Sequence, residues 1–319
     1  MDRAIMSIPE NTGIEAVLRQ ELVQGDRALA SVAPVLNHLL ASPGHALVSD
    51  DVVARMRGML DNIARQLLVV QTKAMGGKTH SDPAQREDEL SGLLAHSTTI
   101  LSHCYALAIE GQIARRLEQQ SGVDPVLTPL MQELIAVKDE GTAELAMAAM
   151  SAQARFMQSQ RRMDLSINDL TADLFHEVLQ IWNKFVRDEG PEVQFATEAR
   201  LRNDYDESSS RPGLISKLVT SMNGGVQACF SLKHAGIVLF ASGIGSKIRQ
   251  PRELVVLACL EQQIARLALT LSATGLKIDQ IAEQLLLLHG EVALPEGFTE
   301  IGPEQALELL TSTQIEGAS

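Results

Sequence analysis

The chain has 319 residues, 45% of them apolar, and a formal charge of −13. Residues 1–75, 76–202 and 203–319 are each net acidic. A protein that binds nucleic acid through its phosphates needs a basic surface, so this composition argues against that class. Aromatic residues make up only 3% of the chain. Packing must therefore rest on Leu, Ala, Ile, Val and Met, a mixture that favours helices over sheets.

The three cysteines, Cys104, Cys229 and Cys259, share no CxxC or CxxH spacing, which argues against a disulfide framework and a zinc site. The N-terminal stretch MDRAIMSIPEN lacks the basic start and apolar core of a secretion signal. The most apolar run, AGIVLFASGIG, is too short to span a membrane. We expect a cytoplasmic protein with no membrane association and no cofactor.

Helix start signals and terminating glycines recur along the chain, which predicts roughly a dozen helices. Two segments, 76–83 and 202–213, combine Gly, Pro, Ser and charged residues without an apolar period, and we interpret them as linkers or loops. They divide the chain into an N-terminal helical region (1–75), a central region (84–201) and a C-terminal region (214–319).

An internal similarity relates the central and C-terminal regions. DPVLTPLMQELI (124–135) aligns with RPGLISKLVTSM (211–222); each is followed by small residues, a basic corner and an expected long helix, DLTADLFHEVLQIWNKF or ELVVLACLEQQIARLAL. The segment 233–247 contains the β-rich run GIVLF, but its counterpart in the first copy has a helical pattern, so we predict a helix there too. This pattern resembles the HEAT-like class of helical arrays, a resemblance that implies an architecture and a scaffold-like role.

The tripeptide Ile-Ala-Arg occurs at 63–65, 113–115 and 264–266. The surrounding apolar residues follow a three-four alternation, so the isoleucine lies on a buried stripe and the alanine allows a second helix to approach. The arginine is rotated by about 200° from that stripe and should face water or a polar partner. Asp61 is expected to pair with Arg65 four residues later.

Glu89, His96, His103 and Glu110 are each seven residues apart. One unbroken helix would place them on one face, as in helical metal sites. Residues seven apart are about 10.5 Å distant along a helix, so no two of them can share an ion without help from another helix. We therefore predict no metal site and name His96 and His103 as the residues that would contribute to one.

His176 and Glu177 lie in an amphipathic pattern, LFHEVLQIW (174–182). A solvent-facing histidine followed by an acid is typical of the phospho-accepting helix of two-component proteins, where the imidazole attacks phosphorus. Gln180 and Ile181 replace the usual polar residue and proline, and the chain has no ATP-binding glycine boxes. We keep a histidine phosphotransfer or signalling protein as an alternative function.

Two basic corners occupy equivalent positions in the two similar segments: Arg155, Arg161 and Arg162 in one, and Lys247, Arg249 and Arg252 in the other. Cations at helix C-termini offset the helix dipole, and an edge for an acidic ligand or partner is the functional alternative. ATGLKIDQIAEQLLLL (273–288) has the pattern of a helix-turn-helix, but only Lys277 is basic there.

These patterns together predict an all-α protein built as an irregular stack of helical hairpins, either a HEAT-like solenoid or a multi-helix bundle. We expect a non-enzymatic scaffold that binds a protein partner, with nucleic acid disfavoured. An unfinished terminal repeat would leave an apolar face, so association of two copies is also expected. A helix-turn-helix regulator that uses 273–288 is the remaining alternative.

Overall fold

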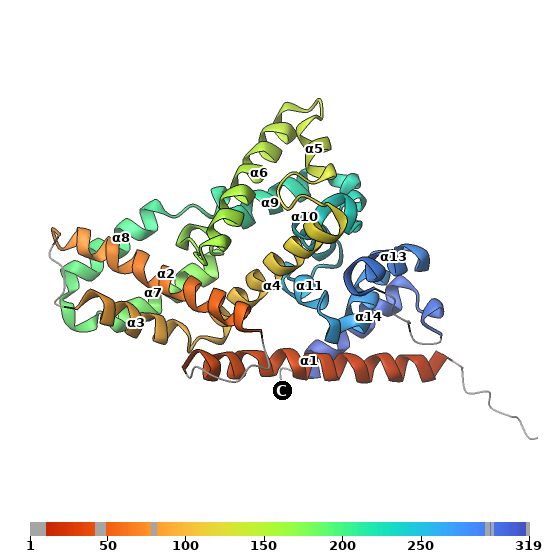
Figure 1. Cartoon of the computed structure of the whole chain (residues 1–319), viewed down its shortest axis with the longest axis horizontal. Helices are drawn as coiled ribbons and strands as arrows, with labels where there is room; N and C mark the ends of the chain where they lie inside the picture. Colours follow the sequence, from red (N-terminus) through yellow and green to blue (C-terminus); the bar gives the residue numbers. More distant parts are fainter. Residues whose placement is uncertain (1–10, 42–48, 78–81, 291–293, 295–296, 317–319) are drawn as a thin grey trace, which may run out of the picture. The chain divides into compact units, whose positions relative to one another are not determined.

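A computed structural model describes residues 11–41, 49–77, 82–290, 294 and 297–316. It confirms the all-α prediction, because it is 83% helical and has no strand in the described ranges. Fourteen α-helices follow one another along the described chain (Figure 1). Their bounds are α1 Asn11–Ala41, α2 Asp50–Ala74, α3 Pro83–Leu94, α4 Thr98–Ser121, α5 Pro129–Ile135, α6 Glu140–Arg161, α7 Ala172–Phe185, α8 Pro191–Asp204, α9 Arg211–Ser221, α10 Leu232–Ile248, α11 Arg252–Ala258, α12 Ile264–Ala273, α13 Ile278–His289 and α14 Pro303–Glu316.

The chain forms two compact units, one made of residues 1–31 and 226–319 and the other of residues 32–225. We call them the terminal unit and the central unit. The predicted boundaries at 76–83 and 202–213 stay predictions, and residues 78–81 lie outside the described residues. The segment 202–213 does have a buried side, since Arg211 is 2% exposed and opens α9.

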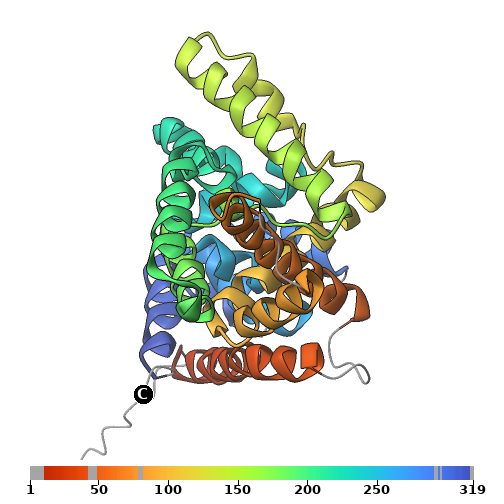
Figure 2. The ribbon, with the colours of Figure 1, turned by 90° about the vertical axis from the view of Figure 1, so that its left-hand side faces the viewer.

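The central unit is organised around α2. This helix packs against α3, α4 and α8, and α3 in turn contacts α7 (Figure 1). Its buried positions recur every three or four residues, as expected for a helix with one core-facing side. They are Val52, Arg55, Met56, Met59, Leu60, Ile63, Ala64, Leu67 and Gln71. Next to this layer, α6 packs against α5 and α9 (Figure 2).

A buried ion pair joins segments that are far apart in the central unit. The guanidinium of Arg211 donates to Glu110, which is 1% exposed, and its Nε donates to Gln153 Oε1 at 2.7 Å. The same guanidinium lies 3.7 Å from the ring centroid of Phe156. The pair fixes the start of α9 against α4 and α6, and removing one partner would leave a buried charge unpaired.

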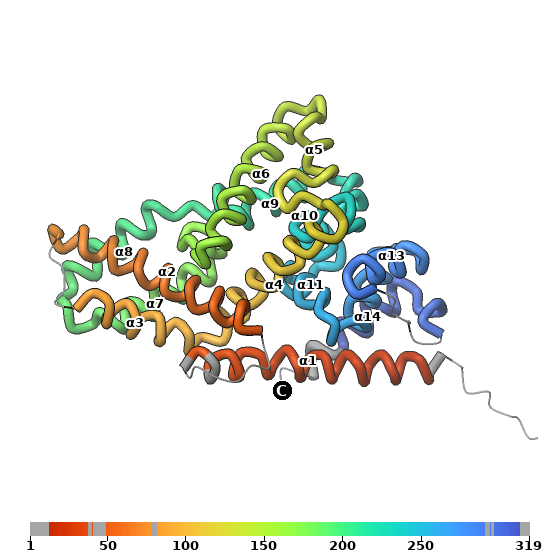
Figure 3. Tube along the Cα trace, viewed as in Figure 1, coloured from red at the N-terminus to blue at the C-terminus, as the bar shows by residue number. Residues whose placement is uncertain are grey.

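The terminal unit gathers α10, α11, α12, α13 and α14 with the first part of α1 (Figure 3). Segment 233–247 is helical as predicted, although Gly236 interrupts it with a φ of 64°. The expected long helix at 253–269 is wrong. It is two helices, α11 and α12, bent by 105° across a 3-10 turn at Glu261–Gln263.

That bend changes the third Ile-Ala-Arg tripeptide. Arg65 is exposed and Arg115 is half-buried, whereas Arg266 is 1% exposed and meets a polar partner, Asp26, as the prediction allows. Ile264 is only half-buried, so the predicted stripe does not continue through the break. The 3-10 turn rotates α12 relative to α11, and the surrounding helices then bury α12 on nearly all sides.

The close contact between Gly58 of α2 and Met163 provides a stability test. A Cβ on Gly58 would lie 2.6 Å from Met163 Cβ and 2.8 Å from its carbonyl oxygen. We expect Gly58→Ala to lower the free energy of unfolding by about 1–3 kcal/mol through overpacking. Gly92→Ala is the matched control, because Gly92 is also helical and nothing lies within 4 Å of its Cβ position.

Gly92→Ala should raise the same free energy by up to about 1 kcal/mol through helix propensity. Urea unfolding followed by circular dichroism measures both variants. Equal midpoints for the two would contradict the close packing of α2 against the segment after α6.

Candidate functional site

The helical hairpin of α2 and α3 carries the candidate site in the central unit. α2 ends at Ala74, where Gly76 and Gly77 adopt positive φ values. Asp82 caps α3 by accepting a hydrogen bond from the backbone N–H of Gln85, and Pro83 occupies its first turn. The short connection makes the two helices antiparallel neighbours, so a seam runs between them along their length.

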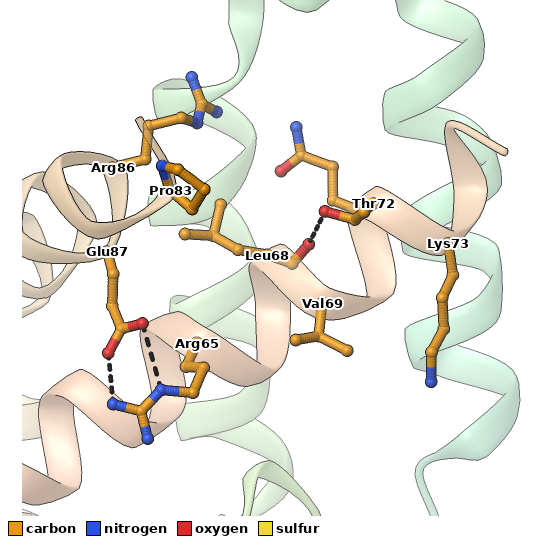
Figure 4. Close-up of a pocket in the computed structure, with 9 residues that line it drawn as sticks. Arg65, Leu68, Val69, Thr72, Lys73, Pro83, Arg86 and Glu87 are labelled. Atoms are coloured by element: carbon orange, nitrogen blue, oxygen red, sulfur yellow. Dashed lines mark hydrogen bonds and ion pairs between the residues drawn. The ribbon is translucent and has the colours of Figure 1, made fainter. Parts of the chain in front are cut away.

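One cavity in this seam has a volume of about 340 Å³, and we call it the apolar cavity. Leu68, Val69 and Pro83 form its aliphatic wall, and Figure 4 shows Leu68 and Pro83 facing one another from the two helices. Val69 is 46% exposed although it is aliphatic. An exposed aliphatic side chain beside a cavity provides apolar surface that a ligand can cover.

Three cations stand around the apolar cavity: Arg65, Lys73 and Arg86. Arg65 makes a two-point ion pair with Glu87 across the seam, with distances of 3.1 Å from Nε and 2.6 Å from Nη2 (Figure 4). The predicted Asp61–Arg65 pair is therefore wrong. Lys73 has no ion-pair partner in the described part of the chain, so it is the cation best placed to meet an acidic ligand.

Buried polar contacts fix the floor of the apolar cavity. Gln71 is 1% exposed; its Oε1 accepts from the indole N–H of Trp182 at 3.2 Å, and its amide nitrogen donates to Glu189. Arg86 also binds Glu189 and lies over the ring of Phe185 at 4.8 Å. This chain of contacts holds α2 and α3 against α7, so the cavity is preformed.

A second cavity of about 250 Å³ lies farther along the seam, where Asn37 and Leu40 of α1 also line it, and we call it the acidic cavity. Its polar lining includes Asp61, Asp88, Ser91 and His96, with Arg57 as the cation. Ser91 Oγ donates to Asp61 Oδ1 at 2.5 Å. Burial raises the pKa of Asp61 above its usual range, and the nearby charges of Glu87 and Asp88 raise it further.

His96 contributes an acceptor to the acidic cavity. Its Nδ1 lies 2.6 Å from the carbonyl oxygen of Gly92, which can only accept, so Nδ1 carries the proton. In the neutral ring Nε2 therefore holds a lone pair. Arg57 is already engaged, since its Nη2 donates to the Leu40 carbonyl at 3.0 Å.

The four polar residues at seven-residue spacing do not lie on one helix. The helix continues through Gly92 but ends at Leu94, and α4 begins at Thr98, so exposed His96 sits in the gap. His103 is 7% exposed on α4, and Glu110 is used by Arg211. No group of three or more His, Cys, Asp or Glu residues with a metal-binding arrangement occurs within the ranges that the structure covers.

His176 is exposed on α7, but the group next to it in sequence is used elsewhere. Glu177 Oε1 accepts a hydrogen bond from Ser97 Oγ at 2.5 Å, and Ser97 caps α4. His176 Nε2 lies 2.9 Å from the amide nitrogen of Gln180. That nitrogen is a donor, so the contact occupies the Nε2 lone pair.

The six residues of the two basic corners belong to different units. Arg155, Arg161 and Arg162 are exposed in the central unit; in the terminal unit Lys247 and Arg249 are exposed and Arg252 is half-buried. Arg161 and Lys247 stand in the last turns of α6 and α10, where cations offset the helix dipole. A role as a ligand edge stays a prediction.

The predicted helix-turn-helix segment corresponds to the end of α12, a turn and α13. The exposed side of α13 carries Asp279 and Glu283, with Lys277 just before the helix. Two carboxylates and one lysine give phosphates little to bind. A DNA-binding role stays an alternative that the geometry does not favour.

A polar cavity of about 480 Å³ in the terminal unit was not predicted from any sequence pattern. Gln263 connects its two sides: its amide nitrogen donates to the Gly25 carbonyl at 2.9 Å, and its Oε1 accepts from Arg266 Nε at 3.2 Å. A Cβ on Gly25 would lie 2.5 Å from Gln263 Oε1, so any larger residue there would have to displace the Gln263 amide. These contacts and the Arg266–Asp26 ion pair hold α1 against α12. We therefore interpret the polar cavity as part of the packing of these helices.

The cysteines offer no nucleophile. Cys104, Cys229 and Cys259 are buried thiols, and burial raises the pKa of the Cys104 and Cys229 thiols to about 12. A thiol with so high a pKa stays protonated near neutral pH, and the thiolate is the reactive form.

None of the described helices is by itself long and apolar enough to cross a membrane, and one bent pair, Arg252–Ala258 with Glu261–Ala273, meets the length and composition test. No family model, no curated protein and no solved structure matches this chain.

The raised pKa of Asp61 predicts how stability depends on pH. A carboxyl group whose pKa is higher in the folded than in the unfolded state destabilises the fold above that pKa, and the effect disappears below its ordinary value of 3.8. Asp61→Asn should therefore raise the urea midpoint at pH 7, and the gain should vanish near pH 3.

Asp51→Asn is the control of opposite sign. The hydrogen bond from Arg55 lowers the pKa of Asp51, so its charge stabilises the fold at pH 7 and that contribution is lost as the pH falls through the lowered value. The variant should have a lower urea midpoint at pH 7. A destabilised Asp61→Asn at pH 7 would contradict the burial of that carboxylate.

Proposed function

We propose that this chain is a non-enzymatic helical scaffold that binds a segment of a partner protein in the seam between α2 and α3. The observation that carries the proposal is the apolar cavity, in which exposed Val69 and its aliphatic neighbours lie beside Lys73 and Arg86. A volume of about 340 Å³ suits a few side chains of a peptide. The repeat relation between the two similar segments is part of the same proposal.

The chemistry of the cavity favours binding over catalysis. Its described lining offers guanidinium, ammonium and amide groups, one hydroxyl and the carboxylate of Glu87, which is already held by Arg65. The lining has no serine, cysteine or histidine that could act as a nucleophile. An aliphatic wall with cations at its rim suits an apolar side chain followed by a carboxylate. A partner segment with that chemistry complements the cations of the apolar cavity, which form a basic site on an otherwise acidic chain.

The predicted cytoplasmic location and the predicted association of two copies are part of this proposal. Three buried cysteines that remain thiols support a reducing compartment, which favours the cytoplasm. Association of two copies is retained as a proposal.

A histidine phosphotransfer protein is the alternative, favoured by the solvent exposure of His176. The contacts of His176 with Gln180 and of Glu177 with Ser97 weigh against it. Incubation with acetyl phosphate and mass spectrometry separates the two functions, because only the alternative places a phosphoryl group on His176.

A pair of valine variants tests the proposed function. Val69→Asp places a carboxylate in the apolar cavity, whereas Val137→Asp makes the same change at another exposed valine of the central unit, 42% exposed against 46%. Both should fold with wild-type circular dichroism, since neither side chain is buried. We expect the amount of each protein captured from cell lysate to be at least tenfold lower with Val69→Asp than with the wild-type chain. With Val137→Asp that amount should equal the wild-type value.

Quantitative mass spectrometry of the captured proteins provides the measurement. Identical capture by the wild type and both variants would show that the seam is not the binding surface.

A further inference from the structure

The two cavities lie one after the other along the α2–α3 seam, and we call this face the groove; Asn37 and Leu40 of α1 border it at the acidic cavity. One stripe of α2 contains residues that follow one another at steps of three or four positions. They are Arg57, Asp61, Arg65, Leu68 and Thr72. Each of these five residues lines one of the two cavities. On the α3 side, Pro83 and Glu87 line the apolar cavity, and Ser91 and the C-cap residue Ala95 line the acidic cavity.

The Arg65–Glu87 ion pair stands between the cavities. The side chain of Arg65 is 55% exposed and that of Glu87 is 21% exposed. A surface pair of this kind contributes only up to about 1 kcal/mol, so a ligand can lie over it or displace it at little cost. The groove is therefore open to an occupant that spans both cavities.

The charges along this groove have a fixed order. At one end the carboxylates of Asp61 and Asp88 outnumber the one cation, Arg57, which keeps its charge while it donates to the Leu40 carbonyl. His96 adds a lone pair in its neutral form. At the other end Lys73 is available, and Arg86 Nε is buried without a hydrogen-bond partner among the described residues. Between the ends lies the aliphatic wall.

We propose that the groove binds a helical segment of the partner whose exposed face carries a basic, an aliphatic and an acidic side chain in that order. The inference rests on the proposed function and adds the chemistry of the ligand and its placement. The basic group meets Asp61 and Asp88, the aliphatic group enters the apolar cavity, and the acidic group meets Lys73. A third helix laid into the seam between two antiparallel helices buries one face, which is a common mode of peptide recognition.

Helix geometry sets the spacing of the ligand. From Asp61 to Lys73 α2 rises about 18 Å, and from Asp61 to Leu68 about 10 Å, at 1.5 Å per residue. A helical ligand that follows α2 therefore needs its aliphatic residue about seven positions from the basic one. Lys73 is five residues, about 7.5 Å, beyond Leu68, and the nearest position on the same face of a helical ligand is four residues after its aliphatic residue, so the acidic residue is expected there.

Synthetic peptides with this spacing test the proposal. The probe is a fluorescein-labelled Ala/Gln peptide that carries Lys, then Leu seven residues later and Glu four residues after the Leu. A second peptide has Glu in place of the Lys, and a third has Asn in place of the Leu.

Fluorescence anisotropy with the full chain gives the affinities. We expect the Lys–Leu–Glu peptide to bind about fivefold more tightly than the Glu–Leu–Glu peptide, the effect of one charge pair in a groove. The Asn peptide should bind at least tenfold more weakly than the Leu peptide.

Variants of two adjacent carboxylates test whether the acidic cavity causes the preference for the Lys–Leu–Glu peptide over the Glu–Leu–Glu peptide. Asp88→Asn should reduce the preference for Lys over Glu to less than twofold. Glu89→Gln, one residue along α3 and outside both cavities, should leave it unchanged. Lys73→Glu should lower the affinity for the Lys–Leu–Glu peptide by at least fivefold.

The outcomes separate this inference from the proposed function. If the Lys and Glu peptides bind equally and Val69→Asp weakens both, the seam binds apolar segments but the charge order is wrong. If no peptide binds, the inference is overturned, while the lysate comparison of Val69→Asp with Val137→Asp still decides the proposed function.

Discussion

The two-sidedness of α2 is the constraint on which the rest of the central unit depends. One side of this helix, from Val52 through Ile63 to Leu67, is buried against its neighbours. Because Gln71 on that side is bound to Trp182 and Glu189, the helix is fixed in rotation. The opposite stripe is thereby presented to the seam with α3, and the character of each cavity follows from the residues on that stripe.

The buried polar contacts explain why an Ala- and Leu-rich chain has a defined arrangement. Aliphatic helices can slide or rotate against one another at small cost, whereas a buried ion pair is satisfied in one register only. In the central unit Arg211 and Glu110 have this role. In the terminal unit Arg266, Gln263 and Asp26 do the same for α1 and α12.

Local patterns were sufficient for the helical class, including the helix at 233–247, because side-chain periodicity and low aromatic content act within one helix. They failed where distant residues decide. Arg266 looked like the exposed Arg65, yet Asp26 and the bend before α12 bury it. Glu110 looked like part of a polar stripe, yet Arg211, 101 positions away, pairs with it inside the core.

The candidate site was out of reach of the sequence for the same reason. A cavity forms from two helices, and no pattern within α2 alone says that Leu68 faces Pro83 or that Arg65 prefers Glu87 to Asp61. A signal was present nonetheless, since Val69 interrupts the polar side of an amphipathic helix. An aliphatic residue at a position that should face water indicates a surface that something else covers.

Hydrogen–deuterium exchange with mass spectrometry tests the central claim most directly, with the full chain measured free and saturated with the Lys–Leu–Glu peptide. The account predicts slower exchange confined to residues 57–73 of α2 and 83–96 of α3 and the turn after it. Protection that instead appeared on α7 around His176 or on α13, or exchange unchanged along the hairpin at saturation, would contradict it.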